Sequence, residues 1–210
     1  MLQPQAIDSY RRKPVQSRSE ATVTAILEAA ARILNKPAKA GFNTNAIAEL
    51  AGISIGTLYQ YFPDKNAILI ALARHQLAKT SQAVLKAMQG QADSLPAGSS
   101  EVDAVRATVR AMIRGFGGRQ RARKYLLEAM IANGLSGELA QPVEAAFLML
   151  LAGTSHSTSL TPLRLFVMTR AVAGLLRAAV MEQSKWLEDP ALEEEIVSLI
   201  YAYLGSPGIP

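Results

Sequence analysis

The sequence contains no cysteine and only two histidines among its 210 residues. Without cysteine the chain has neither a disulfide framework nor a thiolate metal site, as is usual for proteins of the reducing cytoplasm. His75 and His156 lie far apart, and neither has a histidine or carboxylate neighbour at metal-ligand spacing. We therefore expect no metal, no cofactor and no histidine-based catalytic centre.

Long apolar runs are also missing. The longest, residues 145–152, is far shorter than the ~20 residues of a membrane span. The first residues lack the charged-then-apolar pattern of a signal peptide. Residues 115–118 lack the spacing of a dinucleotide-binding loop, and residues 153–157 lack the closing glycine of a nucleophile elbow. These absences predict a soluble, cytoplasmic protein that has no membrane partner and is not an enzyme.

The composition favours helices. Hydrophobic residues make up 50% of the chain, alanine and leucine are abundant, and runs of β-branched residues are few. The net charge of +5 suits a polyanionic partner without identifying one. Residues 131–210 are acidic, whereas Arg11, Arg12, Lys13 and Arg18 form a basic N-terminal arm. This arm either reaches DNA or is a solvated tail.

Residues 42–65 are the most informative stretch of the chain. Thr44 is a candidate N-cap for a short helix, and Gly52 supplies a turn in which a left-handed conformation causes no side-chain clash. Ser54 is a good N-cap for a second helix, which Pro63 ends. A helix of about two turns is unstable alone in water, so it needs a neighbour, as in a helix-turn-helix.

The second of these helices has two different faces. Leu58 and Phe62 point the same way and are expected to pack on the first helix. Gly56 and Gln60 point nearly opposite, with Thr57 and Tyr59 on the flanks. Hydroxyls and amides are common contacts to phosphates and base edges. The pattern also fits a solvated amphipathic helix, so periodicity alone leaves both interpretations open.

The segment Ile47–Lys65 resembles the DNA-binding core of the tetracycline-repressor (TetR) family of transcriptional regulators. Its Ala-Gly-Ile-Ser turn, Gly-Thr-Leu-Tyr centre and Tyr-Phe-x-x-Lys close are present without a gap. The resemblance runs from about Arg18 to about Leu72. It implies an all-α fold, with an N-terminal three-helix helix-turn-helix DNA-binding head and a C-terminal helical body that binds an effector and dimerises.

The resemblance also implies which residues contact DNA. Three fall where the family reads bases: Ile55, Gly56 and Gln60. The others fall mainly where it holds the DNA backbone, some of them reaching a base: Thr44, Asn45, Ser54, Thr57, Tyr59, Tyr61 and Lys65. Ile55 departs from members with a polar side chain there and offers only apolar contact, for example to a thymine methyl. Base reading therefore depends more on Gln60 and Asn45.

Helical periodicity continues through the rest of the chain. We expect helices over 20–34, 64–89, 101–116, 119–133, 137–152, 162–184 and 190–204, with a break at 35–41 and a loop at 90–100. The expected domains are a basic arm over 1–17, a DNA-binding domain over 18–65, and an effector-binding and dimerisation domain over 66–210.

The predicted body contains a basic stripe whose role stays open. Arg106, Arg110 and Arg114 are four residues apart and lie along one helix face. The stripe either attracts an acidic effector or partner, or is a solvated face whose alkyl stems cover apolar surface. We favour the solvated face.

Two sets of body residues are candidates for binding. Apolar residues of the central helices are candidates for an effector pocket: Met112, Phe116, Leu126, Met130, Phe147, Leu150 and Phe166, with Trp186 as a further one. Polar side chains that could anchor a ligand there are Glu128, Asn133, His156 and Arg170. For each apolar candidate the alternative is ordinary core. The family resemblance implies dimerisation through the last two long helices, with these candidate interface residues: Phe166, Val167, Gly174, Leu175, Leu192, Ile196, Leu199 and Tyr203.

Together these features predict a sequence-specific DNA-binding transcriptional regulator. We expect a homodimer that binds an inverted-repeat operator as a repressor and is released by a small, largely apolar effector. The alternative is a helical adaptor, or an enzyme with an incidental helix-turn-helix-like head. An adaptor would not need Tyr-Gln-Tyr and Lys65 on a short helix, and an enzyme would need clustered titratable groups.

Overall fold

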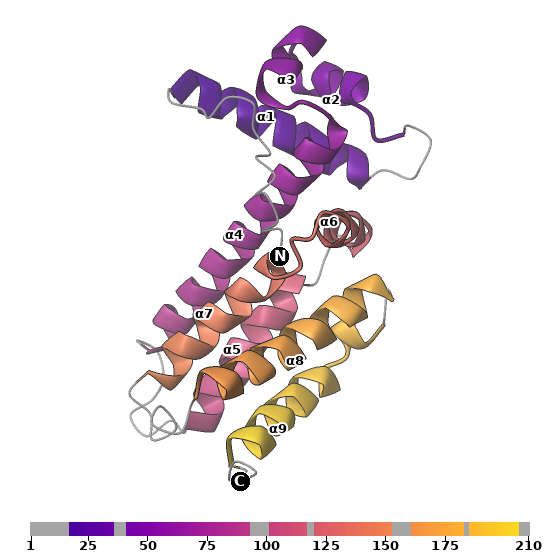
Figure 1. Ribbon diagram of the computed structural model, residues 1–210. Helices are drawn as coiled ribbons and strands as arrows, with labels where there is room; N and C mark the ends of the chain where they lie inside the picture. Colours follow the sequence, from indigo (N-terminus) through magenta and orange to yellow (C-terminus); the bar gives the residue numbers. More distant parts are fainter. Residues whose placement is uncertain are drawn as a thin grey trace. The chain divides into compact units, whose positions relative to one another are not determined.

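The computed structural model describes residues 17–35, 41–92, 101–116, 120–152, 161–182 and 185–205, and these contain helices and no strand (Figure 1). The predicted all-α class is confirmed. The α-helices are α1 (Ser17–Leu34), α2 (Thr44–Ala51), α3 (Ile55–Tyr61), α4 (Lys65–Ala92), α5 (Glu101–Phe116), α6 (Gln120–Ala132), α7 (Gln141–Leu151), α8 (Pro162–Met181) and α9 (Ala191–Gly205), and the short 3-10 helices are η1 (Glu138–Ala140) and η3 (Lys185–Glu188).

The chain forms two compact units. The first comprises Met1–Gln76 and Arg121–Ser136, and the second comprises Leu77–Gln120 and Gly137–Pro210. Helix α4 therefore begins in the first unit and ends in the second. Helix α6 belongs almost entirely to the first unit, although its residues fall in the range predicted for the effector domain. The functional boundaries at residues 17 and 65 stay predictions.

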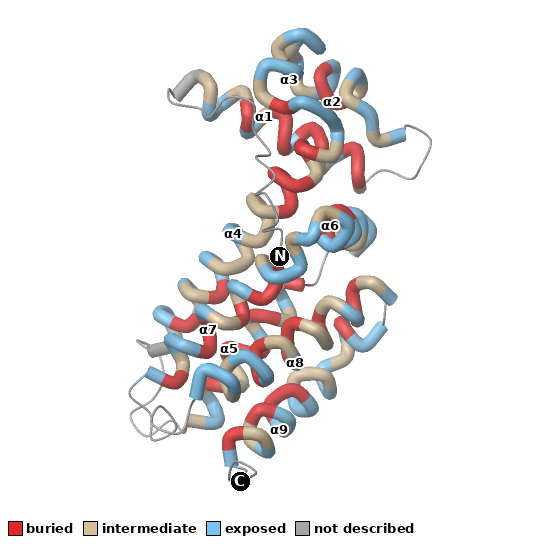
Figure 2. The backbone as a smooth tube through the Cα atoms, in the orientation of Figure 1, coloured by how far each residue is buried: buried red, intermediate tan, exposed pale blue. Residues whose placement is uncertain are grey.

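The core of the first unit holds the two short helices in place. Helix α1 packs on α2, and α2 packs on α3. Ile47, Leu58 and Phe62 are fully buried, as the two-faced pattern of α3 predicts. Figure 2 shows buried segments on α1 and α2. The short helices α2 and α3 thus gain from tertiary packing the stability that they lack alone.

In the second unit, α5 packs on α7 and α9, and α8 packs on α7 and α9. Part of this core is formed by residues that are at most 1% exposed, namely Val105, Phe147, Leu176 and Ile196. Thr161 is the N-cap of α8, because its side-chain oxygen accepts a hydrogen bond from the Arg164 backbone N–H at 3.2 Å. Pro at the first position of this helix reinforces that start.

Several helix boundaries differ from the predicted ones. Helix α1 begins at Ser17, three residues before the predicted start, and α4 continues through Gly90 to Ala92. A single glycine costs a helix only about 1 kcal/mol, so it does not have to end one. The predicted helix over 137–152 is divided into η1 and α7, and the one over 162–184 ends at Met181. Residues 36–40 and 93–100, from the predicted break and loop, lie outside the described residues.

None of the helices in the described part of the chain is long and apolar enough to cross a membrane.

Candidate DNA-binding surface

The turn between α2 and α3 is built as the sequence predicts. Gly52 has φ +69°, the left-handed conformation that glycine adopts without strain. Its N–H donates to the Glu49 carbonyl at 3.1 Å, and the Ile53 N–H donates to the Ala48 carbonyl at 3.0 Å. These bonds satisfy the last carbonyls of α2 and fix the direction in which the chain enters α3.

Ser54 caps α3, as predicted. Its hydroxyl oxygen accepts a hydrogen bond from the Thr57 N–H at 3.0 Å and lies 2.8 Å from the Thr57 hydroxyl. Both side chains are therefore held at the N-terminus of α3, on the surface of the molecule. A recognition helix presents this end to base edges.

The N-cap of α2 is Asn43, and the prediction of Thr44 is wrong. The Asn43 side-chain oxygen accepts from the Ala46 N–H at 2.9 Å, while its amide donates to the Gly41 carbonyl at 2.8 Å. Asparagine is at least as good an N-cap as threonine, and Asn43 precedes Thr44 by one residue, so composition alone could not choose between them. Thr44 is instead the first residue of the helix.

Because Thr44 does not cap α2, its hydroxyl is available for another contact. It lies 3.1 Å from the Tyr59 hydroxyl, a hydrogen-bonding distance that joins the start of α2 to the middle of α3. The two hydroxyls, 15 residues apart in sequence, form one polar feature on the surface. Both residues were predicted to contact DNA, but the sequence does not indicate that their hydroxyls lie within hydrogen-bonding distance of each other.

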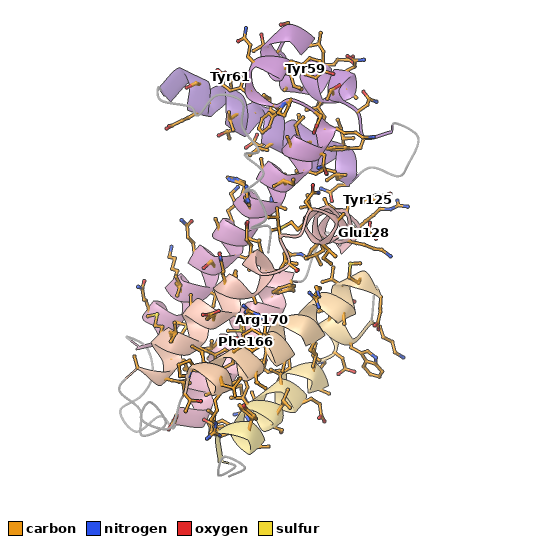
Figure 3. The ribbon with its side chains drawn as sticks, in the orientation of Figure 1. Tyr59, Tyr61, Tyr125, Glu128, Phe166 and Arg170 are labelled. Carbon is orange, nitrogen blue, oxygen red and sulfur yellow. The ribbon has the colours of Figure 1, made fainter. Side chains whose placement is uncertain are left out.

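The other predicted DNA-binding residues lie on the same unit and reach solvent to different degrees. Ile55 and Tyr59 are 38% and 40% exposed. Asn45, Ser54, Gly56, Gln60 and Lys65 are exposed, and Thr44, Thr57 and Tyr61 are half-buried. Figure 3 shows Tyr59 and Tyr61 on the short helix α3. The face opposite to Leu58 and Phe62 is thus a polar surface with one isoleucine in it.

Gly56 is notable because packing does not require it. A Cβ added at this position would meet only the Ser54 hydroxyl oxygen, at 3.8 Å, which is an ordinary contact distance. Its φ is not in the left-handed region, since the glycines with positive φ among the described residues are Gly52 and Gly134. The backbone of α3 is therefore uncovered at Gly56, and no described residue other than Ser54 packs against it on that side.

Lys65 begins α4 beside the surface. The Asp64 carboxylate accepts a hydrogen bond from the Ala67 N–H at 2.8 Å, which caps the start of α4. In the same unit, the Asn66 amide donates to the Asn133 side-chain oxygen at 3.0 Å, so α6 is tied to the start of α4. Asn133, a predicted ligand anchor, is therefore already engaged within the protein.

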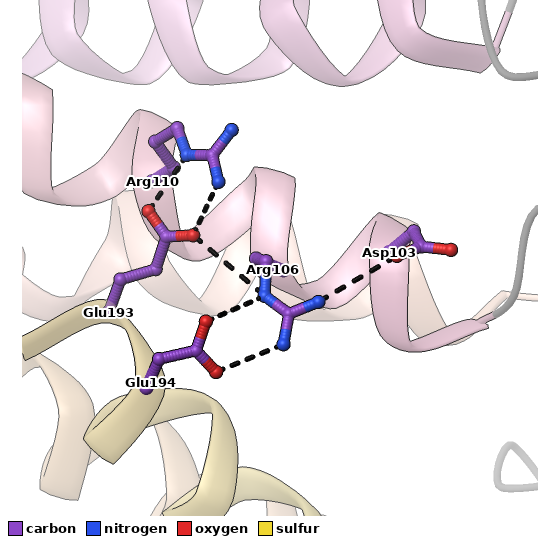
Figure 4. Close-up of polar contacts among 5 residues, drawn as sticks. All are labelled: Asp103, Arg106, Arg110, Glu193 and Glu194. Carbon is purple, nitrogen blue, oxygen red and sulfur yellow. Dashed lines mark hydrogen bonds and ion pairs between the residues drawn. The ribbon is translucent and has the colours of Figure 1, made fainter. Parts of the chain in front are cut away.

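Two residues of the basic stripe, Arg106 and Arg110, form ion pairs within the chain. Arg110 forms two hydrogen bonds with Glu193, at 2.7 and 2.8 Å, and Arg106 forms two with Glu194, at 2.9 and 3.0 Å (Figure 4). Asp103 lies 3.7 Å from Arg106. Neither predicted role of the stripe included these pairs, because the partners are more than 80 residues apart in sequence.

These pairs tie α5 to the first turn of α9. The hydrogen bond from Arg106 lowers the pKa of the Glu194 carboxyl, and the same bond raises the pKa of the Arg106 guanidinium. Arg110 is affected like Arg106, through its hydrogen bond to Glu193. Acidic residues also suit a helix N-terminus, so Glu193 and Glu194 interact favourably with both α9 and α5.

The predicted pocket residues are divided between the two units. Leu126 and Met130 are buried in the first unit, and Met112, Phe116 and Phe147 are buried in the second. Leu150 is half-buried. Phe166 is 55% exposed, and the Arg170 guanidinium carbon lies 5.0 Å from the centroid of its ring. The pocket stays a prediction.

The other candidate ligand-binding residues are less enclosed. Figure 3 shows Glu128 on α6, where it is exposed, and Arg170 on α8, where it lies 3.5 Å from the Glu144 carboxylate. Trp186 is 55% exposed. His156 lies outside the described residues, as do Arg11, Arg12 and Lys13 of the basic arm. Within the described part of the chain, no group of three or more His, Asp or Glu side chains could hold a metal ion.

Most of the predicted dimer residues lie on the surface of α8 and α9. Phe166, Val167 and Leu199 are exposed, and Gly174, Leu175, Leu192 and Tyr203 are half-buried. Ile196 requires a correction, because it is fully buried inside its own unit, where α9 packs on α5. The apolar stripe of α9 is therefore not one surface, because part of it belongs to the core.

The family described as "Bacterial regulatory proteins, tetR family" matches residues 26–72, which include α2 and α3. No curated protein matches the full sequence significantly.

Many solved structures share the fold. A TetR transcriptional regulator from Rhodococcus sp. RHA1 is 21% identical, with a TM-score of 0.61 over 90% of this chain and 98% of that chain. The TetR family repressor AlkX from Dietzia sp. strain DQ12-45-1b, implicated in biodegradation of n-alkanes, is 14% identical, with a TM-score of 0.59 over 87% and 96%. The fatty acid degradation regulator FadR from Bacillus halodurans is 15% identical, with a TM-score of 0.54 over 90% and 96%. At these identities the likeness is one of fold.

Proposed function

The chain belongs to the TetR family of bacterial regulatory proteins, and on this premise we propose that it is a transcriptional repressor that binds operator DNA through α2 and α3. It has the fold of the family's DNA-binding regulators. Its site of action is the chromosome, and hence the cytoplasm of a bacterium.

The observation that carries this proposal is the polar surface of α2 and α3, on which hydroxyls are held in fixed positions. The Thr44 and Tyr59 hydroxyls lie 3.1 Å apart, and the Ser54 and Thr57 hydroxyls lie 2.8 Å apart. Hydroxyl groups, backbone N–H groups at helix starts and lysine are the groups that proteins use to hold phosphates. A surface that is already ordered loses little conformational entropy on binding.

We assign different tasks to the residues of this surface. Tyr59 and Lys65 hold phosphates and fix the register of α3 on the duplex. Gln60 reads a base edge in the major groove, where an amide pairs well with adenine. Ile55 contacts a thymine methyl, and Gly56 lets the helix backbone approach the bases closely.

We further propose that the protein is a homodimer through the exposed faces of α8 and α9. Val167, Gly174 and Leu199 lie on these faces, which the described residues of the chain do not cover fully. A two-fold dimer presents two copies of α3 to an inverted-repeat operator, with half-sites about 34 Å apart before any distortion of the DNA.

Control by a small, largely apolar effector is the last part of the proposal. Met112, Phe116, Phe147 and Met168 are bulky, adaptable side chains buried in the second unit. The names of two structural neighbours, one implicated in n-alkane biodegradation and one a fatty acid degradation regulator, favour a ligand with a hydrocarbon chain. Such a ligand lowers DNA affinity only if it binds the DNA-free state better, typically by 1–3 kcal/mol.

The proposal is tested by mobility shift of genomic DNA fragments with the full chain, in the presence of non-specific competitor DNA. We expect a small set of fragments to be retained, and a ligand found by thermal shift to release them. If no fragment survives competition, the DNA-binding proposal fails. If fragments are retained but every ligand that raises the melting temperature leaves them bound, only the effector proposal fails.

A further inference from the structure

Large and small residues are unevenly distributed along the exposed face of α8. Near its start, Leu163, Phe166 and Val167 are 70%, 55% and 41% exposed. In the middle of the helix, the exposed or half-buried positions in line with Leu163 and Val167 are small, at Ala171, Gly174 and Ala178, and the half-buried Met181 follows at the end. A Cβ added at Gly174 would meet no atom within 4 Å. The side chains of this face are therefore large near the start of α8 and small in its middle.

Helix α7 adds to the large side chains near the start of α8. Glu144 on α7 and Arg170 on α8 form an ion pair at 3.5 Å, which gives the register of these two neighbouring helices (Figure 1). The helices are antiparallel, so one turn after Glu144 lies beside one turn before Arg170. Leu148, which is 51% exposed, is therefore level with Phe166. We call Leu148, Leu163, Phe166 and Val167 the apolar patch.

An exposed tryptophan lies just beyond the other end of α8. Trp186, on η3, is the only tryptophan of the chain and is 55% exposed. The Lys185 ammonium lies 5.1 Å from the centroid of its ring. An indole that is this exposed in a single chain is unusual for a structural core residue, whereas tryptophan is enriched among the residues that dominate binding at interfaces.

Two-fold symmetry relates the patch to the tryptophan. In an isologous dimer whose two copies of one helix lie antiparallel across the two-fold axis, a residue on the N-terminal side of the axis meets a residue on the C-terminal side in the partner's helix. Gly174 is the position where two α8 helices could approach most closely. With the axis there, Val167, seven residues before Gly174, lies level with the partner's Met181, seven residues after it and the last residue of α8. The partner's η3, which follows α8 in the chain and packs on it, is then brought to the start of α8, where the apolar patch lies.

We propose that Trp186 of each protomer packs on the apolar patch of the partner and is the main anchor of the dimer. The inference rests on the proposed homodimer and names the contact that holds it together. It also explains the small residues in the middle of α8, because they let the two helices approach closely enough for the end of each to meet the start of the other. The partner is thus a second copy of this chain.

The test compares the dimer dissociation constants of three proteins by sedimentation velocity over a concentration series. Trp186→Ala removes the anchor, and Tyr125→Ala is the matched control, because Tyr125 is an aromatic residue on α6 with 50% exposure. Loss of one anchor costs at least about tenfold, and each dimer loses two, so Trp186→Ala should raise the dissociation constant about 100-fold or more. Tyr125→Ala should leave it unchanged.

Fluorescence gives a second readout that does not depend on a variant. Because Trp186 is the sole tryptophan, dilution of the wild-type protein through its dissociation constant should shift the emission to the red and increase acrylamide quenching. Phe166→Ala should produce the same shift at higher protein concentration, since it removes the other side of the contact. Circular dichroism confirms that each variant is folded.

The outcomes separate the two proposals. A wild-type protein that is monomeric at all concentrations overturns the homodimer, and the anchor with it. A stable dimer in which Trp186 is quenched as strongly as in the monomer overturns the anchor alone. So does a Trp186→Ala dimer as tight as wild type.

Discussion

Gly56 offers a perturbation in which stability and DNA binding should move in opposite directions. Replacing glycine by alanine within a helix removes conformational freedom from the unfolded chain and stabilises the protein by about 0.5–1 kcal/mol where the new methyl fits. At Gly56 it fits, because the nearest atom is the Ser54 hydroxyl oxygen at 3.8 Å. We therefore expect Gly56→Ala to melt a few degrees higher than wild type.

The same methyl should weaken operator binding. It projects from the exposed side of α3, where our account places the bases, and holds the helix away from them. Loss or displacement of a base contact costs about 1–3 kcal/mol, or roughly five- to 150-fold, for each half-site. With two half-sites, the operator dissociation constant should rise at least about 25-fold, as measured by fluorescence anisotropy.

Gly90→Ala is the matched control. Gly90 lies near the end of α4, and a Cβ there would meet no atom within 4 Å, so this variant should gain similar stability without changing operator affinity. If Gly56→Ala is stabilised but binds the operator as tightly as wild type, α3 does not approach DNA at this position. If Gly56→Ala is destabilised, the packing argument itself is wrong.

Three other predictions concern separate parts of the protein. Lys65→Ala should weaken binding to all DNA sequences alike and reduce the salt slope of log K by about one for each protomer, and an unchanged slope would remove Lys65 from the phosphate contacts. The pKa of the Glu194 carboxyl is lowered in the folded state, so its pair with Arg106 stabilises the folded protein at pH values above the ordinary carboxyl pKa. This stabilisation is lost as the pH falls through the lowered pKa of the folded state. Thermal melts should therefore show a smaller loss of stability in acid for Glu194→Gln than for wild type, and equal losses would mean that the pair adds nothing. Leu199→Arg, on the exposed face of α9, should yield a folded monomer with weakened operator binding, whereas an intact dimer in sedimentation would place the interface elsewhere.

Local chemistry explains which features the sequence could predict. The turn at Gly52 and the cap at Ser54 depend on residues within a few positions of each other, and both were predicted correctly. Asn43 and Thr44 are adjacent and similarly able to cap a helix, so their roles were decided by backbone geometry that composition does not contain.

Contacts between distant segments could not be predicted in the same way. The pairs of Arg106 and Arg110 with the first turn of α9 join residues more than 80 positions apart, and charge alone does not choose the partner. The apolar stripe of α9 presented a related difficulty. Periodicity shows that Ile196 and Leu199 are apolar positions of one helix, but not that Ile196 faces the core while Leu199 faces outwards.

Whether two copies of α3 read a symmetric operator can be measured by selecting binding sites from a random duplex library with this 210-residue chain. We expect an inverted repeat whose half-sites are centred about one helical turn apart or somewhat more. We also expect that Gln60→Ala relaxes the preference at one symmetry-related pair of positions while the rest of the repeat is retained. Failure to enrich any sequence, or enrichment of a site without two-fold symmetry that Gln60→Ala selects unchanged, would contradict symmetric reading by two copies of α3.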